Sequence, residues 1–193
     1  MIIPVVLGYL AGSVPFAFLL TRRAGIDLRR SGSGNLGATN VLRTAGVWQG
    51  VAVLALDVAK GMTAVLIARR VAGGATIAAI AGAAAVVGHI YPVWLGFHGG
   101  KGVAVAAGVF SVLSPAATGV AALLFVVTVW FTRYVSAGSI AATVALPVIT
   151  WWAGAPGAVV LSAAGSGALI LFRHRGNLLR LRSGTEPRIG ARA

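Results

Sequence analysis

The sequence predicts an all-α integral membrane protein, a bundle of about seven transmembrane helices of which some are short or broken. Of its 193 residues, 58% are hydrophobic and 10% are charged, whereas soluble domains carry about 25% charged residues. Its mean hydropathy is +0.92. A chain with so few charged side chains cannot cover a globule with polar groups, and this excludes a soluble domain. The spacing of its apolar runs then gives the number of helices.

A helix needs about 20 apolar residues to cross the ~30 Å hydrocarbon layer. The fourth apolar run is too short to cross upright and ends at Ser114 and Pro115. We keep it as a helix because proline can begin the next helix in its first turn and because short spans are tolerated where they line a polar cavity. The seven predicted spans are 2–20, 46–67, 72–88, 103–114, 116–131, 135–152 and 156–172.

The positive charges are divided unequally between the loops. If the N-terminus lies outside, one face of the membrane receives thirteen Lys and Arg residues and the other receives only Arg69 and Arg70, while Lys60 lies inside a span. Cytoplasmic loops carry the excess of Lys and Arg, so we predict the N-terminus outside and the C-terminus in the cytoplasm, which requires an odd number of spans. The thirteen residues are Arg22, Arg23, Arg29, Arg30, Arg43, Lys101, Arg133, Arg173, Arg175, Arg180, Arg182, Arg188 and Arg192.

Residues 1–193 are predicted to form a single transmembrane domain, because the chain shows no internal repeat and no linker long enough to separate domains. The first residues lack the basic stretch and the small-residue cleavage site of a removed signal peptide, so the first apolar run is expected to stay as a membrane anchor. Stretches rich in Ala and Gly, such as 78–85, suit close packing of membrane helices through small residues.

Composition also limits the chemistry. The chain has no cysteine, which excludes disulfides, thiolate metal sites and cysteine nucleophiles. Three acids and three histidines are too few to build a metal cage, so we expect no metal and no cofactor. A net charge of +13 would suggest nucleic acid for a soluble protein. In a membrane protein the same charge reflects the loops on one face, and no nucleic acid partner is expected.

In the first polar segment, 27–43, glycines alternate with neutral side chains that can form hydrogen bonds. Gly32, Gly34 and Gly37 fit the dinucleotide pattern G-x-G-x-x-G, but no strand precedes them, which excludes a Rossmann site. Gly-rich backbone followed by a helix can still direct N–H groups toward an anion, and Arg43 offers a bidentate fork for phosphate. A flexible charged loop is the alternative interpretation. The neutral side chains that favour binding are Ser31, Ser33, Asn35, Thr39 and Asn40.

The second polar segment, 88–102, nearly matches a P-loop. The spacing is one residue short, and Gly102 stands where that motif has its magnesium-binding Ser or Thr, so nucleotide hydrolysis is not supported. Gly99, Gly100, Lys101 and Gly102 still predict a tight turn that presents backbone donors and one ammonium group just before an apolar helix.

The third polar segment, 173–186, is a basic tail. A basic tail beside a membrane often only binds anionic lipid headgroups, and this remains the alternative interpretation. His174, Asn177 and Glu186 are not needed for that role, which favours a site.

Two ionisable residues lie within the second span. Asp57 and Lys60 are three residues apart, on one face of the helix. Ionisable groups at such depth are costly, and they commonly serve as ion partners or site residues. Together with the three polar segments, they predict a cationic, hydrogen-bonding pocket open to the cytoplasm within an apolar bundle. Such a pocket suits a substrate with a phosphate head and an apolar body.

Taken in order, the polar motifs form one specific set. They are Ser-Gly-Ser-Gly-Asn-Leu-Gly-Ala-Thr-Asn at 31–40 with Arg43, Asp57-Val-Ala-Lys-Gly61, Gly88-His89, Pro92, Phe97, Gly-Gly-Lys-Gly at 99–102, and Arg173-His174 with Asn177, Gly184 and Glu186. The set runs from Gly12 to Glu186 and resembles the bacterial acyl-phosphate:glycerol-3-phosphate acyltransferase family over nearly the whole chain. His98, at a position expected to vary, is a mild departure.

The resemblance implies a multi-pass enzyme of the bacterial inner membrane whose active site faces the cytoplasm. It implies transfer of a fatty acyl group from acyl phosphate to the 1-hydroxyl of glycerol 3-phosphate, forming lysophosphatidate and phosphate in the first acylation step of phospholipid biosynthesis. Neither acyl-CoA nor acyl carrier protein is then a direct donor. The implied partners are the two substrates, membrane lipid and a soluble acyl-phosphate synthase that supplies the donor.

Acyl phosphate is an activated donor, so the enzyme needs chiefly to orient it and to stabilise developing charge. On the matching positions we predict catalytic roles for Ser33, Asn35, Arg43, His174 and Asn177. We predict substrate binding by Gly34, Thr39, Asn40, Lys60, Gly99, Gly100, Lys101, Gly102 and Arg180, and structural roles for Asp57 and Glu186.

The acceptor of the hydroxyl proton stays open at this point. His174 could act as the base, since the unperturbed pKa of histidine is near 6.5. A substrate phosphate could equally accept the proton. A covalent acyl intermediate on Ser33 is the third alternative, although no Ser-His-acid grouping is visible in the sequence.

Two other classes of function compete. An organophosphate transporter would use the same cationic site but would need polar residues on the opposite face, where only Arg69 and Arg70 lie. A non-catalytic lipid-binding scaffold would not need Asp57 and Lys60 within a span.

Overall fold

The computed structural model describes residues 2–190, and these residues form helices and turns without a β-strand. The all-α prediction is therefore confirmed. Arg192, which the charge count assigns to the tail, lies outside the described residues. The helices are α1 (Ile2–Ser13), α2 (Phe16–Arg23), α3 (Ala38–Thr44), α4 (Val47–Ala72), α5 (Ala75–Ile90), α6 (Val103–Leu113), α7 (Pro115–Thr132), α8 (Val135–Trp152), α9 (Gly157–Arg173) and α10 (Arg175–Arg182), with a 3-10 turn, η1 (Val93–Leu95), after α5.

Each of the seven predicted apolar runs forms a helix, namely α1, α4, α5, α6, α7, α8 or α9. Five segments within residues 2–190 are long and apolar enough to cross a membrane, or six if α9 and α10, which are bent by 56° at their junction, form one span. The remaining apolar helix, α6, has only 11 residues. These lengths agree with a membrane bundle in which some spans are short or broken.

The first three predicted runs differ from the structure by more than one residue. The first run is broken at Val14 and Pro15 into α1 and α2, because proline lacks the N–H that would continue the helical ladder. The second run continues past Arg69 and Arg70 to Ala72, and the third starts at Ala75 rather than at 72. Long arginine side chains can remain in a helix end by reaching toward the interface, so charge alone does not end the helix there.

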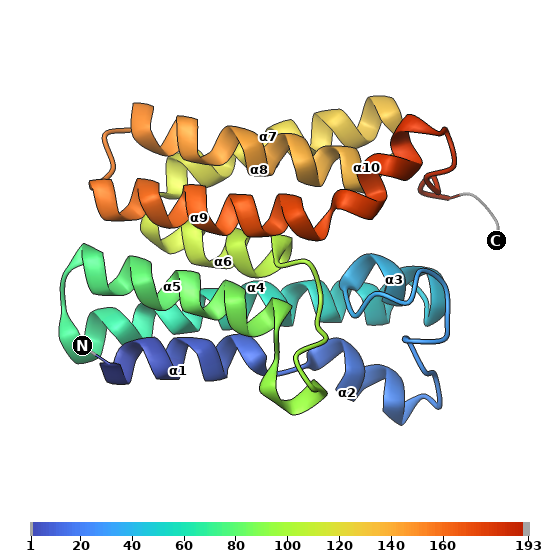
Figure 1. Ribbon diagram of the computed structural model, residues 1–193, viewed down its shortest axis with the longest axis horizontal. Helices are drawn as coiled ribbons and strands as arrows, with labels where there is room; N and C mark the ends of the chain where they lie inside the picture. The colour runs from blue at the N-terminus through green and yellow to red at the C-terminus, as the bar shows by residue number, and fades with distance from the viewer. Residues whose placement is uncertain (1, 191–193) are drawn as a thin grey trace.

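The helices α3 and α10 were not predicted. Both are short, with seven and eight residues, and both contain polar and charged side chains. A search for long apolar runs is insensitive to such helices. They lie with α2 at one end of the bundle, where α3 packs on α4 and α10 follows the end of α9 (Figure 1).

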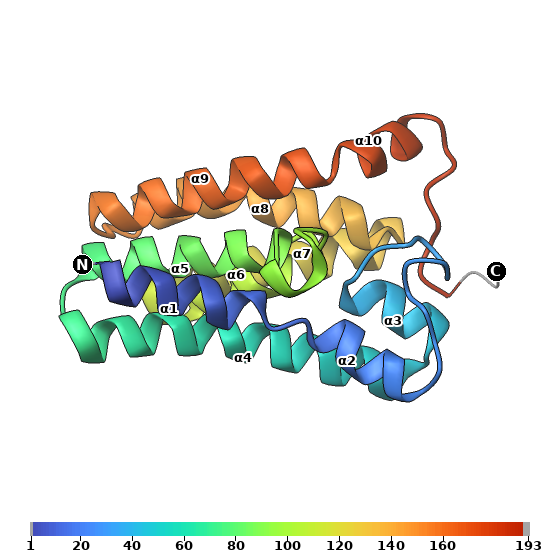
Figure 2. The same ribbon diagram turned by 60° about the horizontal axis from the view of Figure 1, so that its bottom comes forward.

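The two ends of the described chain lie at opposite ends of the bundle (Figures 1 and 2). This agrees with an odd number of passes. Helix α1 packs on α5 and α4, α4 packs on α6, and α5 packs on α9, while the α7–α8 hairpin is joined to the remainder through α9 and α6. The hairpin thus forms one wall that α6 and α9 connect to the other helices.

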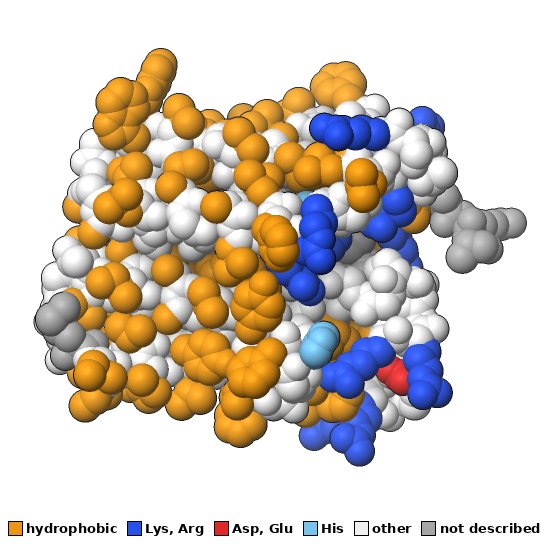
Figure 3. Space-filling model, viewed as in Figure 1, with side chains coloured by type: hydrophobic (Ala, Val, Ile, Leu, Met, Phe, Trp, Pro, Cys, Tyr) orange, Lys and Arg blue, Asp and Glu red, His pale blue; other side chains and the backbone are white. Residues whose placement is uncertain are grey.

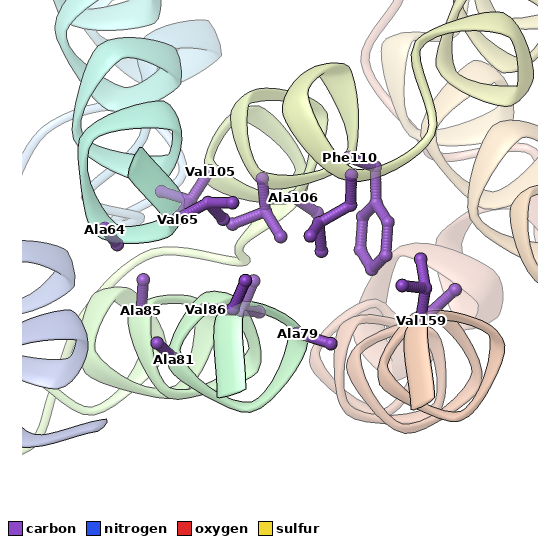
Figure 4. Close-up of a cluster of buried hydrophobic side chains, with 14 of the residues drawn as sticks. Ala64, Val65, Ala79, Ala81, Ala85, Val86, Val105, Ala106, Phe110 and Val159 are labelled. Carbon is purple, nitrogen blue, oxygen red and sulfur yellow. The ribbon is translucent and has the colours of Figure 1, made fainter. Parts of the chain in front are cut away.

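The main core lies where α4, α5, α6 and α9 meet (Figure 4). Val65, Val86, Phe110 and Val159 are fully or almost fully buried there among alanines. Ala78, Ala79, Ala81 and Ala85 have no exposed surface, which confirms the predicted packing through small residues.

Glycines allow the backbones of these helices to approach closely. A Cβ at Gly12 of α1 would overlap the Ala85 carbonyl of α5, and one at Gly108 of α6 would overlap the Val58 carbonyl of α4. No larger side chain fits at these two crossings without moving a helix.

Lys and Arg gather toward one end of the molecule, whereas the remainder of the face seen in Figure 3 is dominated by hydrophobic side chains. We call this the charged end. It contains α2, α3, α10, the 24–37 segment and the α7–α8 turn, and the 91–102 segment lies next to it, nearer the middle of the molecule. Arg43, Lys101 and Arg180, which line the cavity described below, belong to these helices and segments.

Candidate active site

One large cavity, of about 990 Å³, extends from the charged end into the bundle. Polar residues line its outer part, and mostly small or apolar residues of α6, α7, α8 and α9 line its interior. The interior residues include Ala106, Phe110, Ala121, Phe125, Leu146 and Ala163. The cavity therefore joins a polar chamber to an apolar channel.

The glycine-rich segment 31–37 forms one edge of the polar chamber. Asn40, which is 1% exposed, holds this segment in place: its amide donates to the carbonyls of Ser31 and Asn35 at 3.1 and 3.0 Å, and its Oδ1 accepts from the Ser33 N–H at 2.9 Å. Gly32, with φ of +59°, lies against the same amide and has no room for a Cβ. Both polar atoms of the Asn40 amide thus form hydrogen bonds to the backbone of 31–35, and these bonds hold that segment in its conformation.

The predicted tight turn at 99–102 is present, and it is fastened to the end of α5. The Gly99 and Gly100 N–H groups donate to the carbonyls of Ile90 and His89 at 3.0 and 3.2 Å. Gly102 has φ of +94° and begins α6 immediately afterwards. The turn directs Lys101 into the cavity, where Gly102 is also part of the wall.

A chain of hydrogen bonds links Lys101 to the tail. Its ammonium donates to Asn177 Oδ1 at 2.6 Å, and Asn177 Nδ2 donates to Glu186 Oε1 at 2.7 Å. The second oxygen of Glu186 accepts from Arg180 Nε at 2.8 Å. Glu186 is buried and Arg180 is partly exposed. The carboxylate thus orients one amide and one guanidinium at the edge of the cavity.

The pKa of Lys101 is lowered to about 8, chiefly by burial and with a contribution from the nearby Arg180, Arg173 and Arg43, while the charge of Glu186 opposes this shift. Cations gathered in one chamber resist further positive charge. An anion bound among them is expected to favour the charged form of Lys101.

His174 lies at the break between α9 and α10, where it is buried. Burial lowers its pKa to about 4, helped by Lys101 and Arg173, although a hydrogen bond to the Ile170 backbone and the charge of Glu186 oppose this. The carbonyl of Ile170 can only accept, so Nδ1, at 2.8 Å, carries the proton. At pH 7 the ring is neutral and Nε2 is an acceptor.

Asp57 and Lys60 form a buried ion pair with a 2.8 Å separation, and their side chains are 3% and 5% exposed. Lys60 also donates to the Val14 carbonyl at 2.8 Å, at the break between α1 and α2. His89 Nδ1 lies 3.7 Å from the same Asp57 oxygen. The pair therefore ties α4 to the α1–α2 break and to the end of α5.

The structure brings most of the predicted site residues to the cavity wall but not all. Gly34, Gly99 and Gly100 lie outside the wall, the last two as part of the turn beneath Lys101, and the Lys60 ammonium faces Asp57 and Val14. The predicted residues on the wall are Ser33, Asn35, Thr39, Asn40, Arg43, Asp57, Lys101, Gly102, His174, Asn177, Arg180 and Glu186.

Sequence reasoning missed the small hydroxyl side chains of the spans. Ser136, Ser139 and Thr143 of α8 and Ser166 of α9 line the cavity and are buried. Their spacing on α8, three and then four residues, places them on one face of a helix. A polar stripe on one face of an apolar span was the signal that could have revealed them.

The arrangement suits a phosphate-bearing amphiphile. Arg43, Lys101 and Arg180 supply cations and Asn177 supplies an amide, while the channel can bury apolar surface. Among residues 2–190, no three His, Asp or Glu side chains gather into a group that could hold a metal ion.

The family model and the similar proteins all carry the description glycerol-3-phosphate acyltransferase. The family model described as glycerol-3-phosphate acyltransferase matches residues 2–184. A glycerol-3-phosphate acyltransferase of Roseobacter denitrificans is 49% identical over 187 residues, covering 96% of this chain and 92% of the relative. Another of Rhodopseudomonas palustris is 50% identical over 186 residues, covering 96% and 94%.

The fold is also similar to solved structures of PlsY, described as an integral membrane glycerol 3-phosphate acyltransferase. Its glycerol 3-phosphate form superposes with a TM-score of 0.94 at 42% identity, covering 98% of this chain and 95% of that one. Its lysophosphatidic acid form gives a TM-score of 0.91 at 41% identity with the same coverage.

Proposed function

The chain belongs to the glycerol-3-phosphate acyltransferase family and is an integral membrane acyltransferase, and from this premise we propose that it transfers a fatty acyl group from acyl phosphate to the 1-hydroxyl of glycerol 3-phosphate. The products are lysophosphatidate and inorganic phosphate. The observation that carries this proposal is the single cavity in which a cation-lined chamber continues into an apolar channel. PlsY structures in glycerol 3-phosphate and lysophosphatidic acid forms support the acceptor and the product.

The acyl phosphate lies with its chain in the channel and its phosphate near the glycine-rich segment. Burial of an acyl chain contributes about 0.8 kcal/mol per methylene, so the channel supplies affinity while the polar groups set the position of the reacting carbonyl. Ser33, Asn35 and Thr39 provide neutral donors at this edge, and Arg43 provides the charge. Asn40 contributes by fixing the backbone of the segment.

Glycerol 3-phosphate lies against Lys101, with Asn177 and Arg180 beside it. Lys101 is on the wall of the chamber, and the Glu186 carboxylate presents both Asn177 and Arg180. Lys60, which was predicted to bind substrate, has no place in this arrangement, because its ammonium is bonded to Asp57 and Val14.

The proposed reaction exchanges one bond for another at the acyl carbon. The 1-hydroxyl oxygen attacks the carbonyl carbon of acyl phosphate and forms the ester bond, and the bond from that carbon to the phosphate oxygen breaks. Inorganic phosphate leaves with the electron pair, while the hydroxyl proton passes to a base. Cations and oriented donors stabilise the charge that develops on the carbonyl oxygen and on the leaving phosphate.

We assign the proton to His174 Nε2, because the ring is neutral and its Nδ1–H is already held by Ile170. Replacement of His174 with Gln is expected to lower kcat by more than ~10²-fold, the usual effect of removing a general base. Initial rates at saturating substrate measure this. Retained activity would instead give the proton to a substrate phosphate and leave His174 with an orienting role only.

The pH profile tests Lys101. Because its pKa is about 8 in the free enzyme, the ammonium is charged at pH 7 and loses its proton as pH rises through 8. We therefore expect kcat/KM for glycerol 3-phosphate to fall above about pH 8. The Lys101→Arg variant stays charged, so its rate should show no such fall. An identical alkaline limb in both proteins would contradict the assignment.

We further propose that the protein is one domain, 1–193, in the bacterial inner membrane, with its N-terminus outside and the charged end in the cytoplasm. The excess of Lys and Arg at that end supports this orientation. A soluble acyl-phosphate synthase then supplies the donor from the same compartment. Cysteine labelling of single-cysteine variants in intact cells at Arg182 and at Arg70 tests it, since only the second should react with an impermeant reagent.

The activity itself is tested with purified protein in detergent, acyl phosphate and labelled glycerol 3-phosphate. Formation of labelled lysophosphatidate is the expected result. Acyl-CoA offered in place of acyl phosphate is expected to give no product. If no lysophosphatidate forms with either donor, the proposed reaction is wrong.

A further inference from the structure

The chain that follows α10 crosses the mouth of the cavity. Residues 186–190, which we call the strap, pass from the end of α10 toward α3 (Figure 2). Four of them, Glu186, Pro187, Arg188 and Gly190, line the cavity. The strap is therefore part of the cavity lining, although it belongs to none of the helices that form most of the rest of the lining.

The strap bonds to three separate parts of the fold. The Pro187 carbonyl accepts from Arg43 of α3 at 3.2 Å. The Glu186 carboxylate bonds Asn177 and Arg180. On the far side, Arg188 Nε donates to the Tyr134 hydroxyl at 3.2 Å, with its guanidinium 5.3 Å from the centre of that ring.

The bond to the α7–α8 turn is reciprocal. The Ile189 N–H donates to the Arg133 carbonyl at 2.8 Å, and the Arg133 guanidinium donates to the Ile189 carbonyl at 3.2 Å. Arg133 has φ of +64°, a left-handed conformation that glycine adopts without cost and that other residues rarely adopt. Strain of this kind persists where the surrounding structure demands it.

Arg43 has no comparable anchor on its own helix. It lies near the end of the seven-residue α3, it is exposed, and its bond to the strap spans 144 residues of sequence. A long side chain with many rotamers needs such a bond to stay over the cavity. Helix α3 packs chiefly on α4, and α7 packs chiefly on α8 and α6, so the strap is a direct link between Arg43 and the α7–α8 turn.

We propose that the strap holds the Arg43 guanidinium in its working position over the cavity, and that Arg133 is the positioning residue that fixes the strap. Arg133 acts through Ile189 and Pro187 on Arg43 and does not touch the substrate. The proposal rests on the proposed function, because its kinetic test measures kcat/KM for acyl transfer. The central prediction is that the effects of substituting Arg133 and Arg43 on kcat/KM are coupled, because Arg133 acts on Arg43 through the strap.

The test variant is Arg133→Gly. Glycine accepts the left-handed backbone and keeps the carbonyl that bonds Ile189, so the change removes the Arg133 side chain with its guanidinium and relieves the strain of the backbone. We expect unchanged thermal stability and a fall in kcat/KM of about tenfold, the effect of losing one hydrogen bond to a charged group. Arg69→Ala is the matched control, because Arg69 also donates to a distant carbonyl, that of Val112, at the opposite end of the bundle. It should stay within about twofold of wild type.

A double-mutant cycle with Arg43→Ala distinguishes positioning from a general structural role. If Arg133 acts through Arg43, adding Arg133→Gly to Arg43→Ala should change kcat/KM by less than about twofold. If the losses in kcat/KM of the two single variants multiplied in the double variant, the proposal would be overturned. Full activity of Arg133→Gly would overturn it as well. A second variant, Ile189→Pro, removes the N–H that bonds Arg133 and is expected to give the same pattern.

The same cycle is run on the dissociation constant of inorganic phosphate, measured by titration calorimetry on the full chain. If wild type binds phosphate but forms no lysophosphatidate, the proposed function fails and the phosphate cycle decides the role of the strap. Weaker phosphate binding in Arg133→Gly, absent in the Arg43→Ala background, supports positioning. Equal binding in all four proteins, or no binding to wild type, overturns it.

Discussion

Replacing Lys101 with methionine is expected to lower kcat/KM for acyl transfer by about 10³-fold, because truncating one partner of a hydrogen-bonded charge pair costs about 2–5 kcal/mol. Methionine keeps the length of the side chain and removes the ammonium. The change leaves Asn177 Oδ1, now 2.6 Å from the ammonium, without its donor, and it removes the cation that we propose binds the acceptor phosphate. Initial rates as a function of glycerol 3-phosphate concentration measure the loss.

Two further variants show whether that loss comes from the charge of Lys101 and from its place in the cavity. Lys101→Arg keeps the charge and should recover part of the activity, with KM affected more than kcat, because a guanidinium donates from a different geometry. Arg182→Ala removes an exposed cation of α10 that is absent from the cavity wall, and it should behave as wild type. If Lys101→Met and Arg182→Ala proved equally active, Lys101 would not be a substrate ligand.

The second large effect concerns stability. Asp57→Leu removes the carboxylate that faces the buried Lys60 ammonium, and loss of one partner from a buried pair destabilises by about 3–5 kcal/mol. We expect a clearly lower midpoint of thermal unfolding in detergent. Asp27→Ala, which breaks an exposed pair with Arg30 at 3.6 Å, should change the midpoint little, because exposed pairs contribute little.

The double variant Asp57→Leu, Lys60→Met separates a structural role from substrate binding. Replacing both charges with apolar groups of similar size is often neutral or stabilising, so the midpoint should recover. Since Lys60 is absent from the cavity wall, we also expect most of the activity to return. A folded but inactive double variant would restore the predicted role of Lys60 as a substrate ligand.

The helices could be predicted because a bilayer leaves the backbone few choices. Every N–H and C=O group in hydrocarbon must be bonded within the protein, so a long apolar run such as 46–67 becomes a helix whatever its neighbours are. The odd number of passes followed from the distribution of Arg and Lys, and the opposite placement of the two chain ends agrees with it. Helices α3 and α10 escaped prediction because both are short and contain polar and charged residues, whereas the prediction relied on length and hydropathy.

The site was predicted less completely. Its residue types could be identified because phosphate needs cations, neutral donors and open backbone, and glycines among polar residues mark such segments. The contacts of Asn40 and Lys60 could not be identified. Both have the donors of a substrate ligand, and only their partners in space, the 31–35 backbone for Asn40 and Asp57 for Lys60, show that these donors are already occupied.

By itself, the sequence determined the membrane bundle, the concentration of charge at one end and the residue types of the proposed phosphate site, because these follow from local composition and from the solvent that each segment meets. The tertiary structure decided which of these residues share one chamber. Lys101 meets Asn177 across 76 residues, and Arg43 meets the strap across 144. Such contacts depend on how seven apolar helices pack, through small residues and glycines, and no local pattern in the chain specifies that packing.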